Sequence, residues 1–324
     1  MRRSASFFAA LVAFSSPALA DYPERPVTVT VGFAAGGTSD VAARILSERL
    51  TKSLGVAVIV DNKPGAAGSI AAAATAAAAP DGYRIMLADP SAFSINPIMQ
   101  PQNVKYDPMK DFTAIALVGQ SPLVVAVPSA KPFKTIQDLN AFLKANGERA
   151  TYASSGPASI TQFGAEVYLK QAGDLSALHV PYRGGAPMME ALSKAEADFG
   201  VAVLASAIPM ISSGAVRPLM LMAPSATPTV ANVPLMGGGT GSKDSQITSW
   251  VIMIGPKGIP APIVKRLNDA INAVIAEPDV MERMLQAGIE VYKPASPAET
   301  STYLHQDVDR YRTFKSEIGD RLTR

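Results

Sequence analysis

A short segment rich in glycine and hydroxyl side chains follows the first apolar run of the chain and offers donors for an anion. The run 27–31 consists of valine and threonine, which is typical of a buried strand. Two glycines then turn the chain, and Thr38, Ser39 and Asp40 are candidate caps of the helix that follows. Unpaired N–H groups and the helix dipole at such a start favour a carboxylate or a phosphate. The residues also fit a plain strand-to-helix corner, and this segment alone leaves both interpretations open.

Glycine or hydroxyl residues stand at the ends of several apolar runs, the first one included. They lie at Gly36-Gly37, Gly65-Ala66, Ser91, Ser121, Ser154-Ser155 and Gly184-Gly185. Ligands of α/β proteins bind outside the carboxyl ends of strands, and clefts between lobes are the usual pockets. A pocket of this composition would hold a carboxylate through N–H and hydroxyl donors, without an arginine clamp. Arg183 is the one cation placed to help, although a solvated surface arginine fits that position equally well.

Catalytic signatures are missing from the sequence. The two histidines, His179 and His305, lie far apart in the chain, and there is no G-x-S-x-G elbow, H-E-x-x-H pair or P-loop. Asp40 reads as a helix cap and Asp89 as part of a turn, while Glu166 and Asp198 fit element ends or exposed faces. We therefore expect a protein that is not an enzyme and that has no metal or cofactor. An exported α/β enzyme acting on a small carboxylate is the alternative.

The first twenty residues have the pattern of a secretory signal peptide. Arg2 and Arg3 precede a short apolar core, and Ala18-Leu19-Ala20 is an A-x-A cleavage site, so the mature chain is expected to begin at Asp21. Without that leader, 27 basic residues balance 27 acidic ones, which argues against a nucleic-acid binder. The chain has no cysteine, which excludes disulfides and thiol chemistry. The sequence therefore predicts an exported protein of the periplasm.

Strand and helix patterns alternate along the mature chain, which favours mainly parallel sheets covered by helices. The pattern restarts after a run at 123–127, and about 300 mature residues suit two α/β lobes. We expect a first lobe over 21–124, a second over 125–249, and a return to the first lobe with C-terminal helices over 250–324. The runs 123–127 and 250–254 are the expected crossing strands.

The chain resembles the periplasmic receptors of tripartite tricarboxylate transporters, the Bug or TctC-like family, over essentially its whole mature length. The motifs that carry the resemblance are Tyr22-Pro23, Arg25-Pro26, Ala35-Gly36-Gly37 with Asp40, Asn62-Lys63-Pro64-Gly65-Ala66 with Gly68, Pro80-Asp81-Gly82-Tyr83, Asn96-Pro97, Tyr106-Asp107-Pro108, Lys110-Asp111-Phe112 and Val180-Pro181-Tyr182-Arg183-Gly184.

The resemblance implies a two-lobed type II binding protein that closes on a small carboxylate and delivers it to a membrane permease. It also implies that loops 34–38 and 154–156 hold the carboxylate from opposite lobes. We expect a monomer, with a sensory receptor without a transport role as an alternative.

Two positions depart from the family pattern. Gln162 stands where many relatives have histidine, and as part of Ser159-Ile160-Thr161-Gln162 it also fits a capping box. Ala202 stands where many relatives have an aspartate, which argues against an amino-acid ligand because a buried ammonium needs a partner. The expected ligand is a non-amino dicarboxylate, an aromatic one such as terephthalate ahead of a C4–C6 aliphatic acid or citrate. The aromatic preference rests on rings near strand ends, at Phe33, Phe93, Tyr152, Phe163 and Tyr182, for most of which core packing is the alternative.

Together these arguments give one set of expected ligand-binding residues. They are Phe33, Ala35, Gly36, Gly37, Thr38, Asp40, Gly65, Ser91, Phe93, Ser121, Ser154, Ser155, Gly156, Gln162, Tyr182, Arg183 and Ala202.

Overall fold

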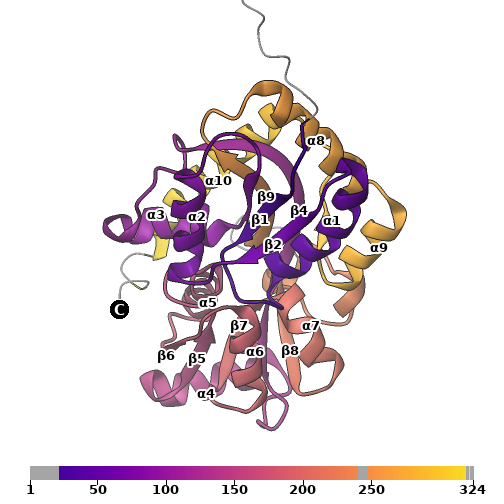
Figure 1. Cartoon of the computed structure of the whole chain (residues 1–324). Coiled ribbons are helices and arrows are strands. Elements are labelled where there is room, and N and C mark those ends of the chain that lie inside the picture. Colours follow the sequence, from indigo (N-terminus) through magenta and orange to yellow (C-terminus); the bar gives the residue numbers. More distant parts are fainter. Residues whose placement is uncertain (1–21, 240–246, 319–320, 322–324) are drawn as a thin grey trace, which may run out of the picture.

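The computed structural model describes residues 22–239, 247–318 and 321, and it consists of two α/β lobes, one above the other in Figure 1. The signal peptide expected at 1–20 lies outside the described residues. The first sheet contains β1 (Val27–Val31), β2 (Val58–Asn62), β3 (Arg84–Ala88), β9 (Thr248–Pro256), β10 (Glu290–Val291) and the first part of β4 (Phe112–Pro128). The second contains the rest of β4 with β5 (Thr151–Ser154), β6 (Leu178–Pro181), β7 (Phe199–Val203) and β8 (Val216–Met222).

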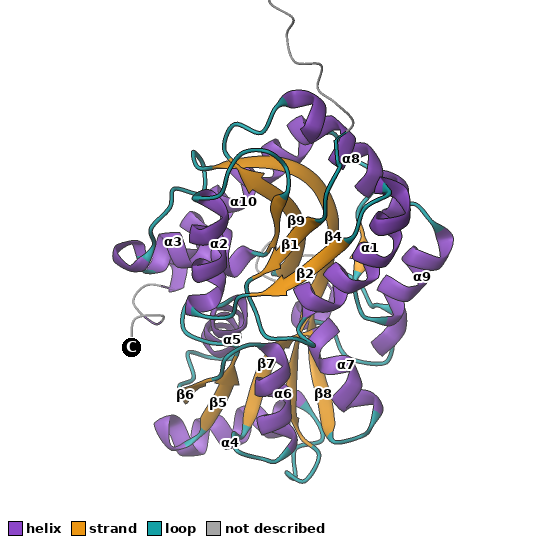
Figure 2. Ribbon diagram, in the orientation of Figure 1, coloured by secondary structure: helices purple, strands orange, loops and turns teal. Residues whose placement is uncertain are grey.

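Helices cover the sheets of both lobes, as Figure 2 shows. The helices of the first lobe are α1 (Thr38–Leu54), α2 (Ser69–Ala76), α3 (Asn96–Met99), α8 (Ala261–Ile275), α9 (Pro278–Gln286) and α10 (Pro297–Ile318). The second lobe has α4 (Ile136–Asn146), α5 (Ile160–Gln171), α6 (Gly185–Ser193) and α7 (Leu204–Ser212). Within the described residues, no helix combines the length and the apolar character that a membrane span requires.

Each sheet has a parallel part and an antiparallel part. In the first sheet β1 runs parallel to β2 and β3, and in the second sheet β5 runs parallel to β6 and β7. The remaining pairs, which involve β4 and β9, are antiparallel. The expected alternation of strands and helices is thus confirmed, but the sheets are mixed and not mainly parallel, because β4 and β9 pair antiparallel with their neighbours.

Strand β4 joins the two sheets. Its residues 112–122 pair with β9, and its residues 123–128 pair with β7 and β8, so the expected crossing at 123–127 is confirmed. The sequence interrupts this strand at Pro122, yet the chain stays extended there, opposite Thr248. The expectation that 250–254 also crosses is wrong. Strand β9 has β3 on one edge and β4 on the other, and both pairings lie in the first sheet. The lobe boundaries near 124 and 249 stay a prediction.

The cores follow from strand burial and amphipathic helices. Val27, Val29 and Val31 of β1 are all at most 1 % exposed, as expected for a central parallel strand. Thr135-Ile136-Gln137-Asp138 and Ser296-Pro297-Ala298-Glu299 have the sequence of capping boxes, and both form: Thr135 and Asp138 cap α4, and Ser296 and Glu299 exchange hydrogen bonds at the start of α10. Helix α10 reaches the second lobe, where Tyr311 and Phe314 pack on the ring of Phe163 in α5.

Candidate functional site

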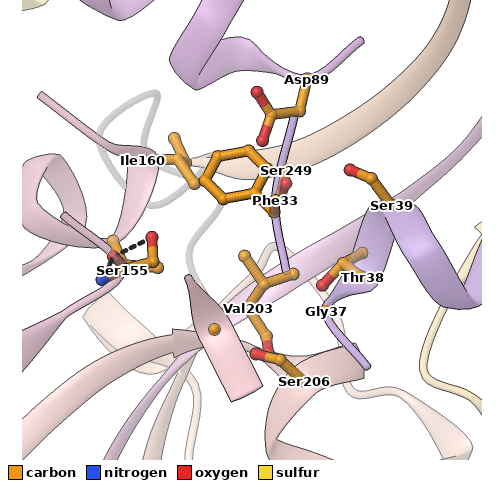
Figure 3. Close-up of a pocket in the computed structure, with 12 residues that line it drawn as sticks. Phe33, Gly37, Thr38, Ser39, Asp89, Ser155, Ile160, Val203, Ser206 and Ser249 are labelled. Atoms are coloured by element: carbon orange, nitrogen blue, oxygen red, sulfur yellow. Dashed lines mark hydrogen bonds between the residues drawn. The ribbon is translucent and has the colours of Figure 1, made fainter. Parts of the chain in front are cut away.

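A small cavity lies between the lobes, where strand ends and helix starts of both sheets meet (Figure 3). About 30 Å³ of it is open to the centre of a water molecule, and the lobes meet beside it, where the Ile160 N–H of one donates to the Ser91 hydroxyl of the other. The first lobe and β9 contribute glycine, hydroxyl, aromatic and acidic residues, and the second lobe contributes glycine, hydroxyl and apolar ones. The lining residues are Phe33, Gly37, Thr38, Ser39, Asp89, Ser155, Ile160, Thr161, Gly185, Val203, Ser206 and Ser249.

The start of α1 offers free donors to this cavity. Gly37 occupies the cap position in an extended conformation, and no side chain caps the helix. The first N–H groups of a helix have no partner within it, and the helix dipole adds a partial positive charge there. Thr38 and Ser39, the first two residues of the helix, line the cavity and are buried. This wall therefore provides N–H and hydroxyl donors for an anion.

Asp40 fixes the turn that leads into α1. Its carboxylate accepts hydrogen bonds from the backbone N–H of Gly36 and from the side chains of Arg44 and Asn62, all at 2.9 Å. Burial acts to raise the pKa of Asp40, but these hydrogen bonds outweigh it and hold the pKa below its usual value. Gly36 has φ of 82°, which suits glycine. Asp40 therefore shapes the loop, and its oxygens already have partners.

The start of α5, in the second lobe, differs because two of its N–H groups already have side-chain partners. The hydroxyl of Ser159 accepts from the backbone N–H of Gln162 at 3.3 Å. The hydroxyl of Ser91, from the first lobe, accepts from the backbone N–H of Ile160 at 3.0 Å across the cavity. The Gln162 side chain accepts from the N–H of Ala158 at 2.7 Å, so its oxygen closes the loop, close to the capping role that the sequence suggested.

The amides of the serine loop 154–156 are also engaged. The N–H of Ser155 donates to the Thr161 hydroxyl at 2.8 Å, and the N–H of Gly156 donates to the Ser154 hydroxyl at 3.1 Å. The hydroxyls of Ser155 and Thr161 lie 2.9 Å apart at the cavity wall. In the closed structure this loop thus presents hydroxyl groups to the cavity.

A second uncapped helix start lies in the second lobe, at α6. Gly184 precedes it without a side-chain cap, and Gly185 lines the cavity beside Ser206. A Cβ placed on Gly185 would lie 2.9 Å from the Ser206 side chain, so a larger residue would displace the helix start. A Cβ on Gly36 of the first lobe would lie 3.5 Å from that of Ala186, so the two loops meet when the lobes close.

Asp89 is the acidic residue of the cavity, and the sequence analysis placed it in a turn. It follows β3, is 6 % exposed, and accepts a hydrogen bond from the N–H of Ala92 at 3.1 Å. Figure 3 shows its carboxyl group pointing toward the ring of Phe33. Burial raises the pKa of Asp89 to about 7 against the opposing hydrogen bonds from Ala92 and Ser91. Asp89 is therefore divided between its neutral and charged forms near neutral pH.

Of the five rings considered from the sequence, Phe33 lines the cavity. Phe93 packs on Phe112 and Trp250 in the first core. Tyr152 stacks on His179, and Phe163 packs against α10. Tyr182 donates to Glu196 at 3.3 Å. One ring, not a sandwich, thus faces the site, because residues at strand ends alternate between the cavity and the cores.

Four of the seventeen expected residues line the cavity: Phe33, Gly37, Thr38 and Ser155. Several others support those elements through hydrogen bonds. Ser121, for example, accepts from the N–H of Ala205 at the start of α7 at 3.2 Å. Gly65 lies in the turn before α2, and Ala202 is buried in β7 opposite Val124 of β4. Ala35 and Arg183 are exposed.

Eight lining residues were not among the expected ones. Ser39, Thr161 and Gly185 lie beside residues that were expected, so the sequence signal was present there. Ser206 and Ser249 had no such signal, because only the packing of α7 and β9 brings them to the cavity.

A serine–histidine pair bears on the enzyme alternative. The Ser154 hydroxyl lies 2.6 Å from Nε2 of His179, and burial lowers the pKa of His179 to about 4. Ser154 is fully buried and lies outside the cavity lining, so its oxygen is not presented to a substrate. Among the described residues, no cluster of three or more histidine, aspartate or glutamate side chains is placed to hold a metal ion.

Comparison with known proteins identifies the family. A family model described as the tripartite tricarboxylate transporter family receptor matches residues 42–319. The chain belongs to this family. It is therefore a solute receptor of the periplasmic binding protein class, and the two-lobed fold expected from the sequence is confirmed.

Three solved structures are similar to this receptor over nearly their whole length. The periplasmic binding protein BugD is 32 % identical with a TM-score of 0.86, covering 92 % of this chain and 99 % of that one. Rpa4515 of Rhodopseudomonas palustris, solved with adipate, is 26 % identical with a TM-score of 0.88 and the same coverage. MatC from the same organism, with bound malate, is 27 % identical with a TM-score of 0.85, covering 90 % of this chain and 99 % of that one.

Proposed function

We propose that this receptor captures a small dicarboxylate between its lobes and delivers it to a tripartite tricarboxylate transporter permease. The observation that carries the proposal is the pair of uncapped helix starts, α1 and α6, which reach the same cavity from opposite lobes. Each supplies N–H donors and a partial positive charge where a carboxylate binds. The adipate and malate in the two similar structures support a dicarboxylate. We further propose that the protein acts as a periplasmic monomer after removal of a leader that ends at Ala20.

The cavity favours an aliphatic C4–C6 dicarboxylate over an aromatic one. One ring, that of Phe33, lines it, so a flat ligand such as terephthalate would have an aromatic partner on one face alone. This order reverses the preference from the sequence, which assumed several rings around the ligand.

An amino-acid ligand is the second candidate, and Asp89 is the observation that favours it. The sequence argument against an amino acid rested on Ala202, but Ala202 lies within β7 outside the cavity lining. Asp89 supplies an acidic group inside the cavity that an ammonium could pair with.

A thermal-unfolding screen separates these ligands. The panel contains malate, adipate, citrate, terephthalate, aspartate and glutamate. A ligand at one hundred times its dissociation constant adds about 2.7 kcal/mol of stability. We expect the largest rise in Tm with malate or adipate, and a rise with the amino acids alone would contradict the proposal.

Prolonged incubation followed by mass spectrometry of the ligand addresses the enzyme alternative. A receptor returns the bound compound unchanged, whereas a new product would indicate turnover. Uptake of the identified ligand by cells that contain the permease, with and without this receptor, then separates transport from sensing.

A further inference from the structure

We propose that Asp89 binds the ligand in its neutral form, sharing one proton with the ligand's second carboxylate, so that ligand capture takes up a proton. This inference rests on the proposed function, because it assigns a partner to the far end of the proposed dicarboxylate. It makes Asp89 a specificity-determining residue of the site.

The composition of the cavity leads to this inference. Asp89 is the one ionisable side chain among its twelve lining residues, which include no arginine, lysine or histidine. The donors at α1 and α6 satisfy one carboxylate of the ligand. When the lobes close, the second carboxylate lies in a small cavity whose wall holds another carboxyl group and no cation. Two adjacent carboxylates in a buried site do not both ionise, and one shared proton joins them by a strong hydrogen bond.

Asp89 accepts hydrogen bonds from the N–H groups of Ala92 and Ser91, and a carboxylate oxygen that accepts one hydrogen bond keeps a second lone pair that can take the proton. Oδ1 accepts from the N–H of Ala92 at 3.1 Å. Oδ2 has a long contact of 3.4 Å with the hydroxyl of Ser91, which in turn accepts from the N–H of Ile160. Burial already raises the pKa of Asp89 to about 7, and an added carboxylate raises it further because like charges disfavour the ionised form.

Within residues 22–239 and 247–318, the charged groups near Asp89 are paired elsewhere. Beside the cavity, Tyr106 and Tyr311 have pKa values raised by burial and are neutral. On α10, which packs on the segment after Asp89, Asp307 and Arg310 pair with each other. On α1, Asp40 is paired with Arg44. From the second lobe, the lining residues Ser155, Ile160 and Thr161 carry no charge.

The protonation of Asp89 determines whether the affinity for the ligand rises or falls with pH. Free Asp89 is mostly protonated below pH 7 and mostly charged above it. Binding that requires the protonated form therefore weakens as pH rises above 7, by about tenfold per pH unit. At pH 6 little extra proton is taken up, because Asp89 already holds it.

Calorimetry with adipate and malate, from pH 6 to pH 8.5, tests the inference on the wild-type protein. Titrations in two buffers of different ionisation enthalpy count the protons. We expect about one proton taken up per ligand at pH 8, and close to none at pH 6. Adipate or malate binding without proton uptake at pH 8 would overturn the inference and leave the proposed function intact. If neither they nor any other carboxylate in the thermal screen binds, the proposed function fails, and the inference fails with it.

Two variants identify the group that takes up the proton. Asp89→Asn keeps an acceptor for Ala92 and gains a fixed N–H donor, so its affinity is expected to be independent of pH and at least tenfold above wild type at pH 8.5. Asp89→Ser should also bind without pH dependence, and it provides a second variant if the first folds poorly. Asp309→Asn removes an exposed carboxylate on α10 and should keep the wild-type profile. Loss of binding in Asp89→Asn, with aspartate or glutamate bound by the wild type, would show instead that Asp89 pairs with an ammonium.

Discussion

Helices α1 and α5 both direct their N-terminal ends at the cavity, but their donors are in opposite states. α1 begins at Gly37 without a side-chain cap. In α5 the N–H of Gln162 is satisfied by Ser159 from its own lobe, and the N–H of Ile160 by Ser91 from the other. Because a helix start binds an anion only with free N–H groups, α1 is suited to hold the ligand. The Ser91 bond to α5 forms when the lobes meet, so α5 is suited to hold the closed state.

The difference predicts that capping α1 will abolish binding. Gly37→Asp places a carboxylate where the ligand's carboxylate is expected, and φ of −78° at this position accepts any residue. We expect a loss of affinity of roughly 100-fold. The helix itself should gain about 0.3 kcal/mol from the cap. Titration calorimetry gives the affinity, and thermal unfolding without ligand gives the stability.

Gly37→Ala is the matched control, because it adds a Cβ without an acceptor. It should bind far better than Gly37→Asp. Equal losses in the two variants would mean that the added volume, not the occupied donors, is responsible.

Removing the cross-lobe cap of α5 should weaken closure. Ser91→Ala leaves the N–H of Ile160 without its acceptor in the closed state, which costs about 1–2 kcal/mol. We expect affinity to fall about tenfold. Small-angle scattering with ligand should show a more open average shape than in wild type.

Ser121→Ala makes a useful comparison with this variant. Ser121 caps α7, but it lies on β4, which passes through both lobes, so its bond does not depend on closure in the same way. A scattering change as large as that of Ser91→Ala would argue against a special role of Ser91 in closure.

The loop that presents the free donors of α1 depends on Asp40. Asp40→Asn weakens charge-assisted hydrogen bonds from Gly36 and Arg44, and we expect a loss of about 1–2 kcal/mol of stability at pH 7, measured by urea unfolding. Since the pKa of Asp40 is held below its usual value, its stabilisation is present above about pH 4 and is lost as the pH falls through its folded-state value. The difference in unfolding free energy between Asp40→Asn and the wild type should therefore become smaller below pH 4. A difference in unfolding free energy that stays the same at all pH values would indicate that the substitution acts through packing.

The smallest effect is expected at Arg183. This side chain is exposed and forms no hydrogen bond or ion pair within the described part of the chain. Arg183→Ala should change affinity by less than about twofold. A tenfold loss in calorimetry would instead place its guanidinium on the ligand.

Most of the fold was predictable because local patterns decide it. Apolar runs predicted β1 and β9, and capping boxes predicted the starts of α4 and α10. The errors lie where tertiary pairing overrides a local signal. A proline removes an N–H from a strand, yet β4 continues through Pro122 with β9 alongside. The role of β9 was misread because nothing local shows that both of its edges are occupied.

The site was harder to predict, since it is assembled from both lobes. Gly37 and Thr38 carry a local signature, a glycine turn before a helix. Asp89 carries none, because its burial and its position opposite the second lobe depend on closure. The prediction that several aromatic rings face the ligand was wrong for a related reason. A ring at a strand end faces the cavity or the core according to the register of the strand, which the sequence leaves open.

The position of β9 also bears on the order in which the parts of the first sheet are synthesised. In the first sheet β9 separates β3 from β4, although it is made more than a hundred residues after either of them. The ribosome, or any channel that releases the chain from its N-terminal end, therefore delivers every strand of the second sheet before the first sheet can be completed. The lobe that begins the chain is therefore the last to have all its strands delivered, after the segments that carry α5 and α6.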